Sequence, residues 1–451
     1  MKIILSTLIV VAVLSTAFYA VNFKSNVEAA SNISQKLVNY NSTNTAISTI
    51  SGNLYSYVSD DGNFAAWNSA SHDVVTGDTS SGPVVYLRDL RSGDAAIASM
   101  GESGVVSSEA EFAVSRTGRY VAFSSRALDV VGDPDVSLRP GLHLYLRDML
   151  LGTTRLVDQS AAGIPGNLPY GGQAIARSVS DDGRYVTFYT ESTNLLTSST
   201  GGGGFFFVKD MLTGAVINPT ASNTGLNSNA STLGYVLSSC DGSFVVFGAA
   251  ATNLTAQDNG NSNTYFVDLR TGYNITNLTH LANKGARPVS ISCNGRYILL
   301  SSQSTNLTAD TVSGVEIHLF LLDRMTGVYE LVDKSSAGVV GTKNVYGYGS
   351  RRTVSDNGRV VFFANDANLI SPASPYSLEV YVRDTESGTT EALPVDSAGI
   401  EKGLGTTTTT VTKSLSISSD GKSIVYNSVA SGLIPGVGAL GGMKVVLGRF
   451  N

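Results

Sequence analysis

The sequence predicts an all-β protein, a seven-bladed β-propeller built from four-stranded antiparallel blades. A phrase of the form Ser-x-Asp/Asn-Gly (Thr replaces the acid in one copy), followed by an apolar run, recurs seven times in the 451 residues. A second turn phrase follows six of these copies, so each unit has room for four short strands. The repeat spacing of 53 to 65 residues suits such a unit. The glycines of the first phrase are Gly62, Gly118, Gly183, Gly242, Gly295, Gly358 and Gly421.

The first phrase predicts a tight hairpin between strands that we call a and b. Asp-Gly and Asn-Gly are typical hairpin turns because glycine reaches positive φ without a steric penalty. The serine three residues before each glycine can bind amides of the turn. The segment that follows, such as 120–123 (YVAF), is apolar throughout, as expected for a strand covered on both faces.

The second phrase predicts another hairpin, between strands c and d. It has the form of YLRDLRSG, ending at Gly93, and its aspartate precedes the glycine by four residues. Because this aspartate recurs at one position of the repeat, we interpret it as a cap of the turn and not as a metal ligand. The aspartates are Asp89, Asp148, Asp210, Asp268, Asp323 and Asp384.

The two ends of the chain predict how the ring closes. The seventh unit ends at MKVVLGRFN, after strand c. Residues 34–42 (SQKLVNYNS) resemble the strand d segments TRLVDQS and ELVDKSS, so an N-terminal strand is expected to complete the last blade. This arrangement removes a free sheet edge. A tandem of β-sandwiches, the competing fold, would need about 100 residues per unit.

The N-terminal segment predicts export. Residues 1–29 combine Lys2 with an apolar run from Ile3 to Val21, which is typical of a signal peptide; an uncleaved membrane anchor is the alternative. Residues 30–451 are expected to form a single propeller domain. The protein is therefore expected outside the cell, on its surface or in the periplasm, with no membrane span in the mature chain unless the N-terminal segment is retained.

The repeat phrases also carry a family resemblance. The combination of SxDGRYVAFSS, xATNL, YVRDxxTG and LVDxSSAG resembles the exported WD40-like (PD40) repeats of the TolB-type β-propeller superfamily. ATNL stands at Ala251–Leu254, and STNL stands at Ser192–Leu195 and Ser304–Leu307. The resemblance covers residues 34–450 and implies the fold, whereas members of the superfamily bind proteins, peptides or glycans or carry an enzyme site. Unlike TolB itself, the chain is expected to have no α/β domain before its propeller.

Charge and motifs exclude several functions. The net charge of −6 argues against a nucleic-acid partner. No nucleophile elbow, phosphate loop or zinc-protease helix is present, and the four histidines fall in different units. No cofactor and no metal are expected. Cys240 and Cys293 hold the same position in neighbouring units, where a disulfide or two separate thiols are the alternatives.

The best candidate site is the funnel where the d–a connections enter the inner strands. Tyrosine and arginine are common in binding hot spots. We therefore expect a module that binds or scaffolds a protein or a glycan; a glycan hydrolase or lyase with its site at the funnel, and a structural subunit of a surface layer or filament, are the alternatives. The candidate residues are Tyr55, Glu111, Arg177, Tyr235, Arg287, Tyr348, Arg351, Arg352 and Lys413.

Overall fold

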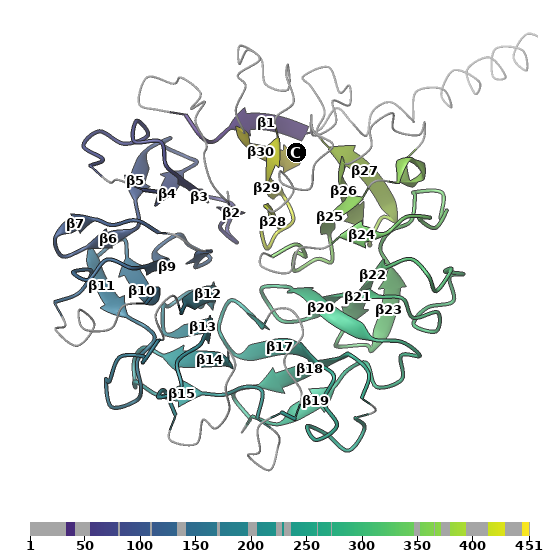
Figure 1. Ribbon diagram of the computed structural model, residues 1–451. Coiled ribbons are helices and arrows are strands. Elements are labelled where there is room, and N and C mark those ends of the chain that lie inside the picture. The colour runs from purple at the N-terminus through teal and green to yellow at the C-terminus, as the bar shows by residue number, and fades with distance from the viewer. Residues whose placement is uncertain are drawn as a thin grey trace, which may run out of the picture.

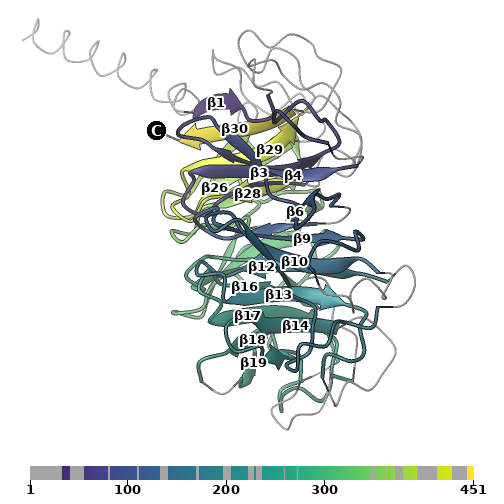
Figure 2. The same ribbon diagram turned by 90° about the vertical axis from the view of Figure 1, so that its left-hand side faces the viewer.

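Seven four-stranded antiparallel sheets surround a central axis in the computed structural model, as the repeat predicts (Figure 1). Seen from the edge, the ring is a disc (Figure 2). None of the described residues form a helix long and apolar enough to cross a membrane. The predicted signal segment, 1–29, lies outside the described residues. These are 33–40, 55–79, 82–108, 111–132, 141–168, 172–196, 205–221, 228–229, 236–258, 260–271, 273–346, 352–364, 366–370, 379–393, 414–428 and 444–450.

Each blade contributes one strand to each of four positions, a to d, from the axis outward, and we number the blades I to VII in the order of their a strands along the chain. The a strands are β2 (Ser56–Val58), β8 (Ala113–Val114), β12 (Ala174–Val179), β16 (Leu237–Ser238), β20 (Ala286–Ile291), β24 (Val345–Tyr346) and β28 (Leu415–Ile417). The b strands are β3 (Phe64–Ser69), β9 (Tyr120–Ser125), β13 (Tyr185–Thr190), β17 (Phe244–Ala249), β21 (Tyr297–Ser302), β25 (Val360–Ala364) and β29 (Ser423–Ser428).

The c and d strands form the outer half of each blade. The c strands are β4 (Val84–Asp89), β10 (His143–Asp148), β14 (Phe205–Asp210), β18 (Asn263–Asp268), β22 (His318–Asp323), β26 (Glu379–Asp384) and β30 (Lys444–Phe450). The d strands are β5 (Ala95–Ile97), β11 (Thr153–Leu156), β15 (Val216–Ile217), β19 (Ile275–Asn277), β23 (Val328–Leu331), β27 (Thr389–Leu393) and β1 (Ile33–Leu37). A small hairpin of β6 (Met100–Gly101) and β7 (Gly104–Val105), and a 3-10 turn at Ala367–Leu369, complete the described elements.

The repeated phrases form the predicted turns. In the first copy, the Ser59 hydroxyl accepts a hydrogen bond from the Phe64 amide at 2.9 Å, and an equivalent serine bond recurs in five other copies. In the remaining copy the Ser355 hydroxyl accepts from the Arg359 amide, one residue earlier in the turn. All seven a–b glycines have positive φ. A Cβ on Gly118 would also lie 2.5 Å from the Phe64 ring of the preceding blade, so this position has no space for a side chain.

The c–d aspartates cap their turns, as predicted. The Asp148 carboxylate accepts hydrogen bonds from the Leu150 and Leu151 amides at 2.9 and 3.1 Å. It also pairs with Arg119, which begins the hairpin return in the same blade, at 2.8 Å. The turn and the two middle strands of the blade are therefore held by one side chain.

The hydrophobic core lies between neighbouring blades. In one cluster, Val246 of β17 packs with Leu300 of β21 and Phe320 of β22, all nearly inaccessible to solvent. A buried cationic side chain near the end of strand c also joins neighbouring blades through hydrogen bonds. The Lys209 ammonium donates to the carbonyls of Gln159, Ser160 and Gly214 at 2.8 to 3.0 Å, and so joins blade III to the connection that precedes it.

The N-terminal strand completes the last blade, which confirms the predicted closure. β1 pairs antiparallel with β30, from Ile33 opposite Phe450 to Leu37 opposite Val446 (Figure 1). Just beyond β1, the Asn39 side chain accepts a hydrogen bond from the Val445 amide at 2.8 Å. This bond repeats one made in other blades by aspartates at the same position, so the N-terminal segment has the full geometry of a strand d.

Candidate functional site

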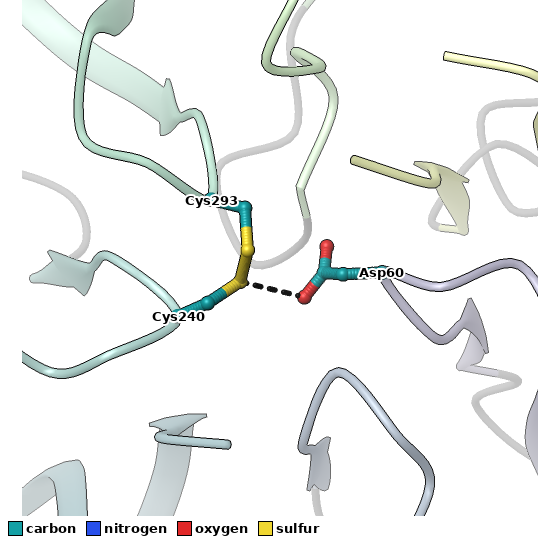
Figure 3. A group of neighbouring side chains, drawn as sticks. All are labelled: Asp60, Cys240 and Cys293. Carbon is teal, nitrogen blue, oxygen red and sulfur yellow. Dashed lines mark hydrogen bonds between the residues drawn. A yellow bond between two sulfur atoms is a disulfide. The ribbon is translucent and has the colours of Figure 1, made fainter. Parts of the chain in front are cut away.

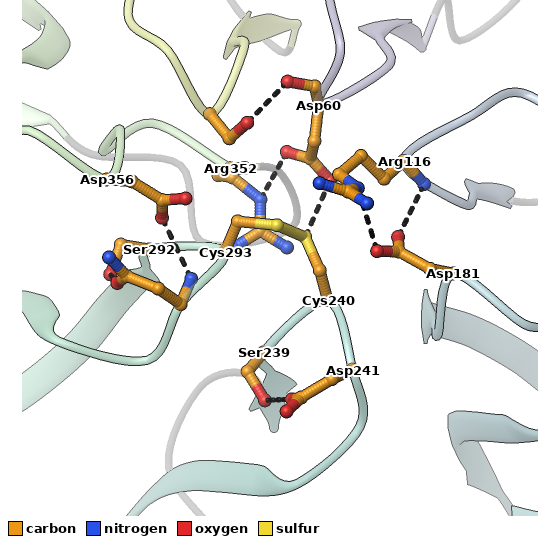
Figure 4. The surroundings of a disulfide bond; sticks show 12 residues. Asp60, Arg116, Asp181, Ser239, Cys240, Asp241, Ser292, Cys293, Arg352 and Asp356 are labelled. Carbon is orange, nitrogen blue, oxygen red and sulfur yellow. Dashed lines mark hydrogen bonds and ion pairs between the residues drawn. A yellow bond between two sulfur atoms is a disulfide. The ribbon is translucent and has the colours of Figure 1, made fainter.

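Seven side chains from the same position of the repeat converge at one end of the axis. They follow the serine of the first phrase directly, at the point where each a strand turns into its b strand. We call them the axial ring, and Figure 4 shows six of them labelled around the axis. The members are Asp60, Arg116, Asp181, Cys240, Cys293, Asp356 and Ser419.

The axial ring is linked from blade to blade around the whole circle. The Arg116 guanidinium pairs with Asp181 at 2.8 Å, and the Asp181 amide donates to the Cys240 carbonyl at 2.8 Å. Cys240 and Cys293 form a disulfide, and their backbones are also hydrogen-bonded. The remaining links are Asn294 amide to Asp356 carboxylate (2.8 Å), Asp356 amide to Ser419 carbonyl (2.7 Å), Ser419 amide to Asp60 carbonyl (2.7 Å) and Asp61 amide to Arg116 carbonyl (3.2 Å).

Asp60 crosses the axis and contacts the opposite side of the ring. One oxygen, Oδ1, lies 2.5 Å from Nε of Arg352. The other, Oδ2, accepts from the Tyr57 hydroxyl at 3.1 Å and lies 3.0 Å from Sγ of Cys240 (Figure 3). Arg352 also donates to the Ile291 carbonyl at 2.6 Å. A buried ion pair and a disulfide thus meet where the a–b turns close the channel.

Burial dominates the electrostatics of these carboxyl groups. Burial raises the pKa of Asp60 to about 6, although the neighbouring Arg352 and the Tyr57 hydroxyl favour the charged form. Burial also raises the pKa of Asp181 and of Asp356. The ring therefore contains carboxyl groups that take up protons more readily than exposed aspartates do.

The channel above the ring is narrow where the structure describes it. A cavity of about 40 Å³ lies there, with space for about three water molecules. A second ion pair, between Arg177 and Glu111 at 2.5 Å, lies beside it.

The structure describes five of the nine predicted funnel residues, and they differ in surroundings. Arg177 pairs with Glu111, and Arg352 pairs with Asp60. Tyr55 is half-buried, and its amide donates to the Asn68 side chain at 2.7 Å. Arg287, at the start of β20, is the exposed member of the five. The other four, Tyr235, Tyr348, Arg351 and Lys413, lie outside the described residues.

Two of the histidines have a structural role inside the blades. His143 hydrogen-bonds Asp158 at 2.7 Å, and His318 hydrogen-bonds Asp333 at 2.6 Å. All four side chains are buried between strands c and d, away from the axial ring. Each aspartate also accepts the amide of the residue after its histidine, which is the same bond that Asn39 makes in the last blade.

A larger hollow of about 710 Å³ lies between blades V and VI, near the tight turns. Arg296 pairs with Asp323 there at 2.7 Å, and Tyr297 and the exposed Glu386 also line it. In the four preceding blade contacts, a Cβ on the a–b glycine would lie 2.4 to 2.8 Å from an aromatic ring; at Gly358 the Tyr297 ring is 3.4 Å away. The Tyr297 ring therefore packs less closely against the next a–b turn than the rings at the four preceding contacts do, and Thr385 Oγ1 is the nearest atom to this position.

Sequence reasoning identified the two cysteines but missed the rest of the axial ring. The available signal was position: each member follows the serine of a repeated turn, so seven-fold symmetry must bring all seven together. The ion pair of Asp60 with Arg352 had no such signal, because Arg352 lies outside the repeated position.

Comparison with known proteins supports the fold. No family model matches the chain, and no curated protein matches it in sequence. The chain is similar to a solved oligogalacturonate lyase in complex with manganese, with a TM-score of 0.52 and 12% identity over 93% of this chain and 96% of that one. It is also similar to an oligogalacturonate lyase of Vibrio parahaemolyticus (TM-score 0.49, 11% identity, 93% and 97% covered).

TolB of Acinetobacter baumannii is another similar structure, with a TM-score of 0.35 and 16% identity. The match covers 61% of this chain and 53% of that one, so it spans about half of the TolB chain. At these identities the similarities concern the propeller fold alone. The resemblance of the repeat phrases to TolB-type propellers also concerned the fold.

Proposed function

We propose that this chain is an exported propeller that binds or scaffolds a protein or a glycan through the face that carries its long connections. The observation that carries this proposal is the unequal length of the connections at the two ends of the strands. Because a and c strands run opposite to b and d strands, the a–b and c–d turns share one face. The b–c and d–a connections share the other, which we call the loop face.

The lengths differ sharply between the two faces. A typical a–b turn is the five residues 59–63, whereas the b–c connections run from the 13 residues of 250–262 to the 17 of 126–142. The d–a connections run from the eight residues of 278–285 to the 21 of 394–414. Long, variable connections on a rigid scaffold are where binding residues usually lie.

Part of the loop face is held in place by a repeated asparagine clamp. The Asn167 side chain, in a d–a connection, donates to Thr193 Oγ1 at 3.0 Å and accepts from its amide at 2.8 Å. The Asn167 amide in turn donates to Asn194 at 2.9 Å. The clamp recurs at Asn229 with Thr252 and Asn253, and at Asn283 with Thr305 and Asn306.

These clamps favour binding because a connection that is already ordered loses less entropy when a ligand arrives. They also give the ATNL phrase a physical reason, since its threonine and asparagine are the clamp partners. Export is supported by residues 1–29 and by the disulfide, because structural disulfides persist in oxidising compartments.

A glycan-cleaving enzyme is the second candidate, since an oligogalacturonate lyase shares the fold over nearly the whole chain. Among the described residues, however, only Asp60, Cys240 and Cys293 bring three groups of the His, Cys, Asp and Glu type together, and the two sulfurs are bonded to each other. This favours binding over metal-dependent catalysis. A structural subunit of a surface layer or filament is the third candidate, and a retained N-terminal segment would favour it.

The test is a glycan array and a pull-down from the medium and envelope of the native host, using residues 30–451. Arg287→Glu and Arg287→Ala probe the loop face, because this exposed residue stands at the start of β20, and Glu386→Arg is the matched control on the turn face. Arg352→Ala is unsuited to this purpose because it would leave Asp60 buried without its cation. We expect the loop-face variants to lose the ligand and the control to keep it.

Each result has a defined meaning. Loss of ligand in Glu386→Arg alone would place recognition on the turn face and overturn the proposal, as would the absence of any ligand in both assays. Oligogalacturonate is incubated with the chain, with and without manganese, and its length is measured by chromatography. If the oligogalacturonate becomes shorter, the proposed function would be catalysis and not binding. Mass spectrometry of the native N-terminus separates a secreted chain from an anchored one.

A further inference from the structure

We propose that Asp60, Cys240 and Cys293 form a binding site for a zinc-like, thiophilic divalent cation when the disulfide is reduced. Three ligand atoms, one from each residue, lie within 4.8 Å of one another, and all three side chains are buried (Figure 3). They come from blades I, IV and V, so the cation would connect opposite sides of the axial ring. This inference is independent of the ligand proposed for the loop face.

The proximity of the Asp60 carboxyl group to the two sulfurs is what makes these three residues a candidate ligand set. Oδ2 of Asp60 lies 3.0 Å from Sγ of Cys240. A disulfide sulfur has no hydrogen to donate, and an ionised carboxylate has none either. In the oxidised chain a protonated carboxyl group can donate to the sulfur at this distance. Once the sulfurs are thiolates, a divalent cation can bind the carboxylate oxygen and both sulfurs instead.

The carboxylate is already oriented for this role. Arg352 holds Oδ1 at 2.5 Å, and the Tyr57 hydroxyl donates to Oδ2 at 3.1 Å, which leaves a second lone pair of Oδ2 toward the sulfurs. Carboxylate ligands of metals are commonly held by such outer partners. The two cysteine Cα atoms are 4.7 Å apart on neighbouring turns. Small side-chain rotations therefore suffice to bring the thiolates to the separation of about 3.8 Å that tetrahedral zinc imposes.

The charge around the site favours a cation in the reduced state. Asp181 and Asp356 lie in the same ring, and with Asp60 and two thiolates they outnumber the positive charges of Arg116 and Arg352. Two thiolates and one carboxylate match the preference of zinc, and water would complete the tetrahedron. Calcium and magnesium prefer oxygen ligands and are excluded by the sulfurs.

The reductive step balances with a dithiol reductant. The reductant gives two electrons and two protons; the S–S bond breaks, two S–H bonds form, and the sulfurs of the reductant join in a disulfide. Binding of the cation then releases the two thiol protons to solvent, because thiolate is the ligand form. No other reactant is required.

The experiment uses residues 30–451, reduced with dithiothreitol that is then removed by anaerobic gel filtration. Cobalt(II) is the probe because thiolate coordination gives it charge-transfer bands in the near ultraviolet and d–d bands in the visible. We expect one cobalt per reduced chain, displacement by zinc but not by calcium, and no bands in the oxidised chain. Bound zinc should also slow re-formation of the disulfide by at least tenfold.

Variants separate the ligands from their surroundings. Cys240→Ser should abolish the bands. Asp60→Asn removes a direct ligand and should weaken cobalt binding by at least the roughly 10-fold that loss of an outer partner costs. Asp181→Asn, which keeps all three ligands, should retain the bands. The proposal fails if a folded, reduced chain with two titratable thiols binds no more cobalt than Cys240→Ser. It also fails if the reduced chain unfolds, or if the oxidised chain binds the metal equally well.

Discussion

Replacement of Asp60 by asparagine should remove a pH dependence from the free energy of unfolding. Burial raises the pKa of Asp60 from 3.8 to about 6 in the folded chain. When folding raises the pKa of a carboxyl group, the free energy of unfolding is highest at a pH below the unfolded pKa, where the group is protonated in both states. It falls as the pH rises from the unfolded pKa to the folded pKa, because the folded chain must then keep a proton that the unfolded chain has released, or bury a charge. A pKa difference of about two units between the folded and the unfolded chain corresponds to about 3 kcal/mol in the free energy of unfolding.

The assay is urea unfolding of the oxidised chain and of Asp60→Asn, at a series of pH values between about 3.5 and 7.5. The quantity compared is the free energy of unfolding of the natural chain minus that of the variant. It should fall by about 3 kcal/mol as the pH rises from about 4 to above 6. Subtraction removes the titrations that the two chains share.

Asp210→Asn is the matched control with the opposite sign. Although burial opposes it, hydrogen bonds from Arg184 and from turn amides lower the pKa of Asp210 to about 2. Its contribution to stability should therefore be present at neutral pH and be lost as the pH falls from about 4 to about 2. If the Asp60 difference instead grows with pH, Arg352 outweighs burial and the reasoning is refuted; a flat difference refutes it as well.

Three further variants test other contacts of the propeller. The double variant Cys240→Ser/Cys293→Ser frees a loop of 53 residues in the unfolded chain, and its free energy of unfolding should be about 4 kcal/mol lower in urea titrations. Asn39→Ala leaves the buried Val445 amide unpaired and should cost about 1–3 kcal/mol, with faster hydrogen exchange at that amide. Lys209→Met removes the ammonium donor of three carbonyls, of which that of Ser160 still accepts from the Gly163 amide, and should lower the thermal midpoint by several degrees, as calorimetry would show. An unchanged value in any of the three variants would contradict the role given to that side chain.

The fold was predictable because the turns are encoded locally. Ser59 and Gly62 act within five residues of each other, and the same pair recurs in every blade, so repetition in sequence reports repetition in space. The closure was predictable for a related reason. Residues 34–42 keep the strand d pattern, including Asn39 where other blades have aspartate.

The site was harder to predict because its members share a position and not a chemistry. Asp60, Arg116 and Cys240 occupy equivalent places in their blades, yet no motif relates a carboxylate, a guanidinium and a thiol. Arg352 was grouped with Arg287 as a funnel residue, but the ion pair with Asp60 depends on which side of an inner strand each side chain faces. That contact joins blades that are far apart in sequence, so local patterns do not contain it.

The pairing of β1 with β30 has a consequence for the order of folding. Ile33 and Phe450 are at opposite ends of the described chain, so closing this blade carries the largest loop-closure entropy in the molecule. Six blades can form from contacts within one or two repeats, whereas the seventh waits for both ends. During synthesis, β1 should remain an unpaired strand until the last strand is released. The unpaired edge of β1 could then pair with strands of other chains, so it needs protection from aggregation until β30 is available.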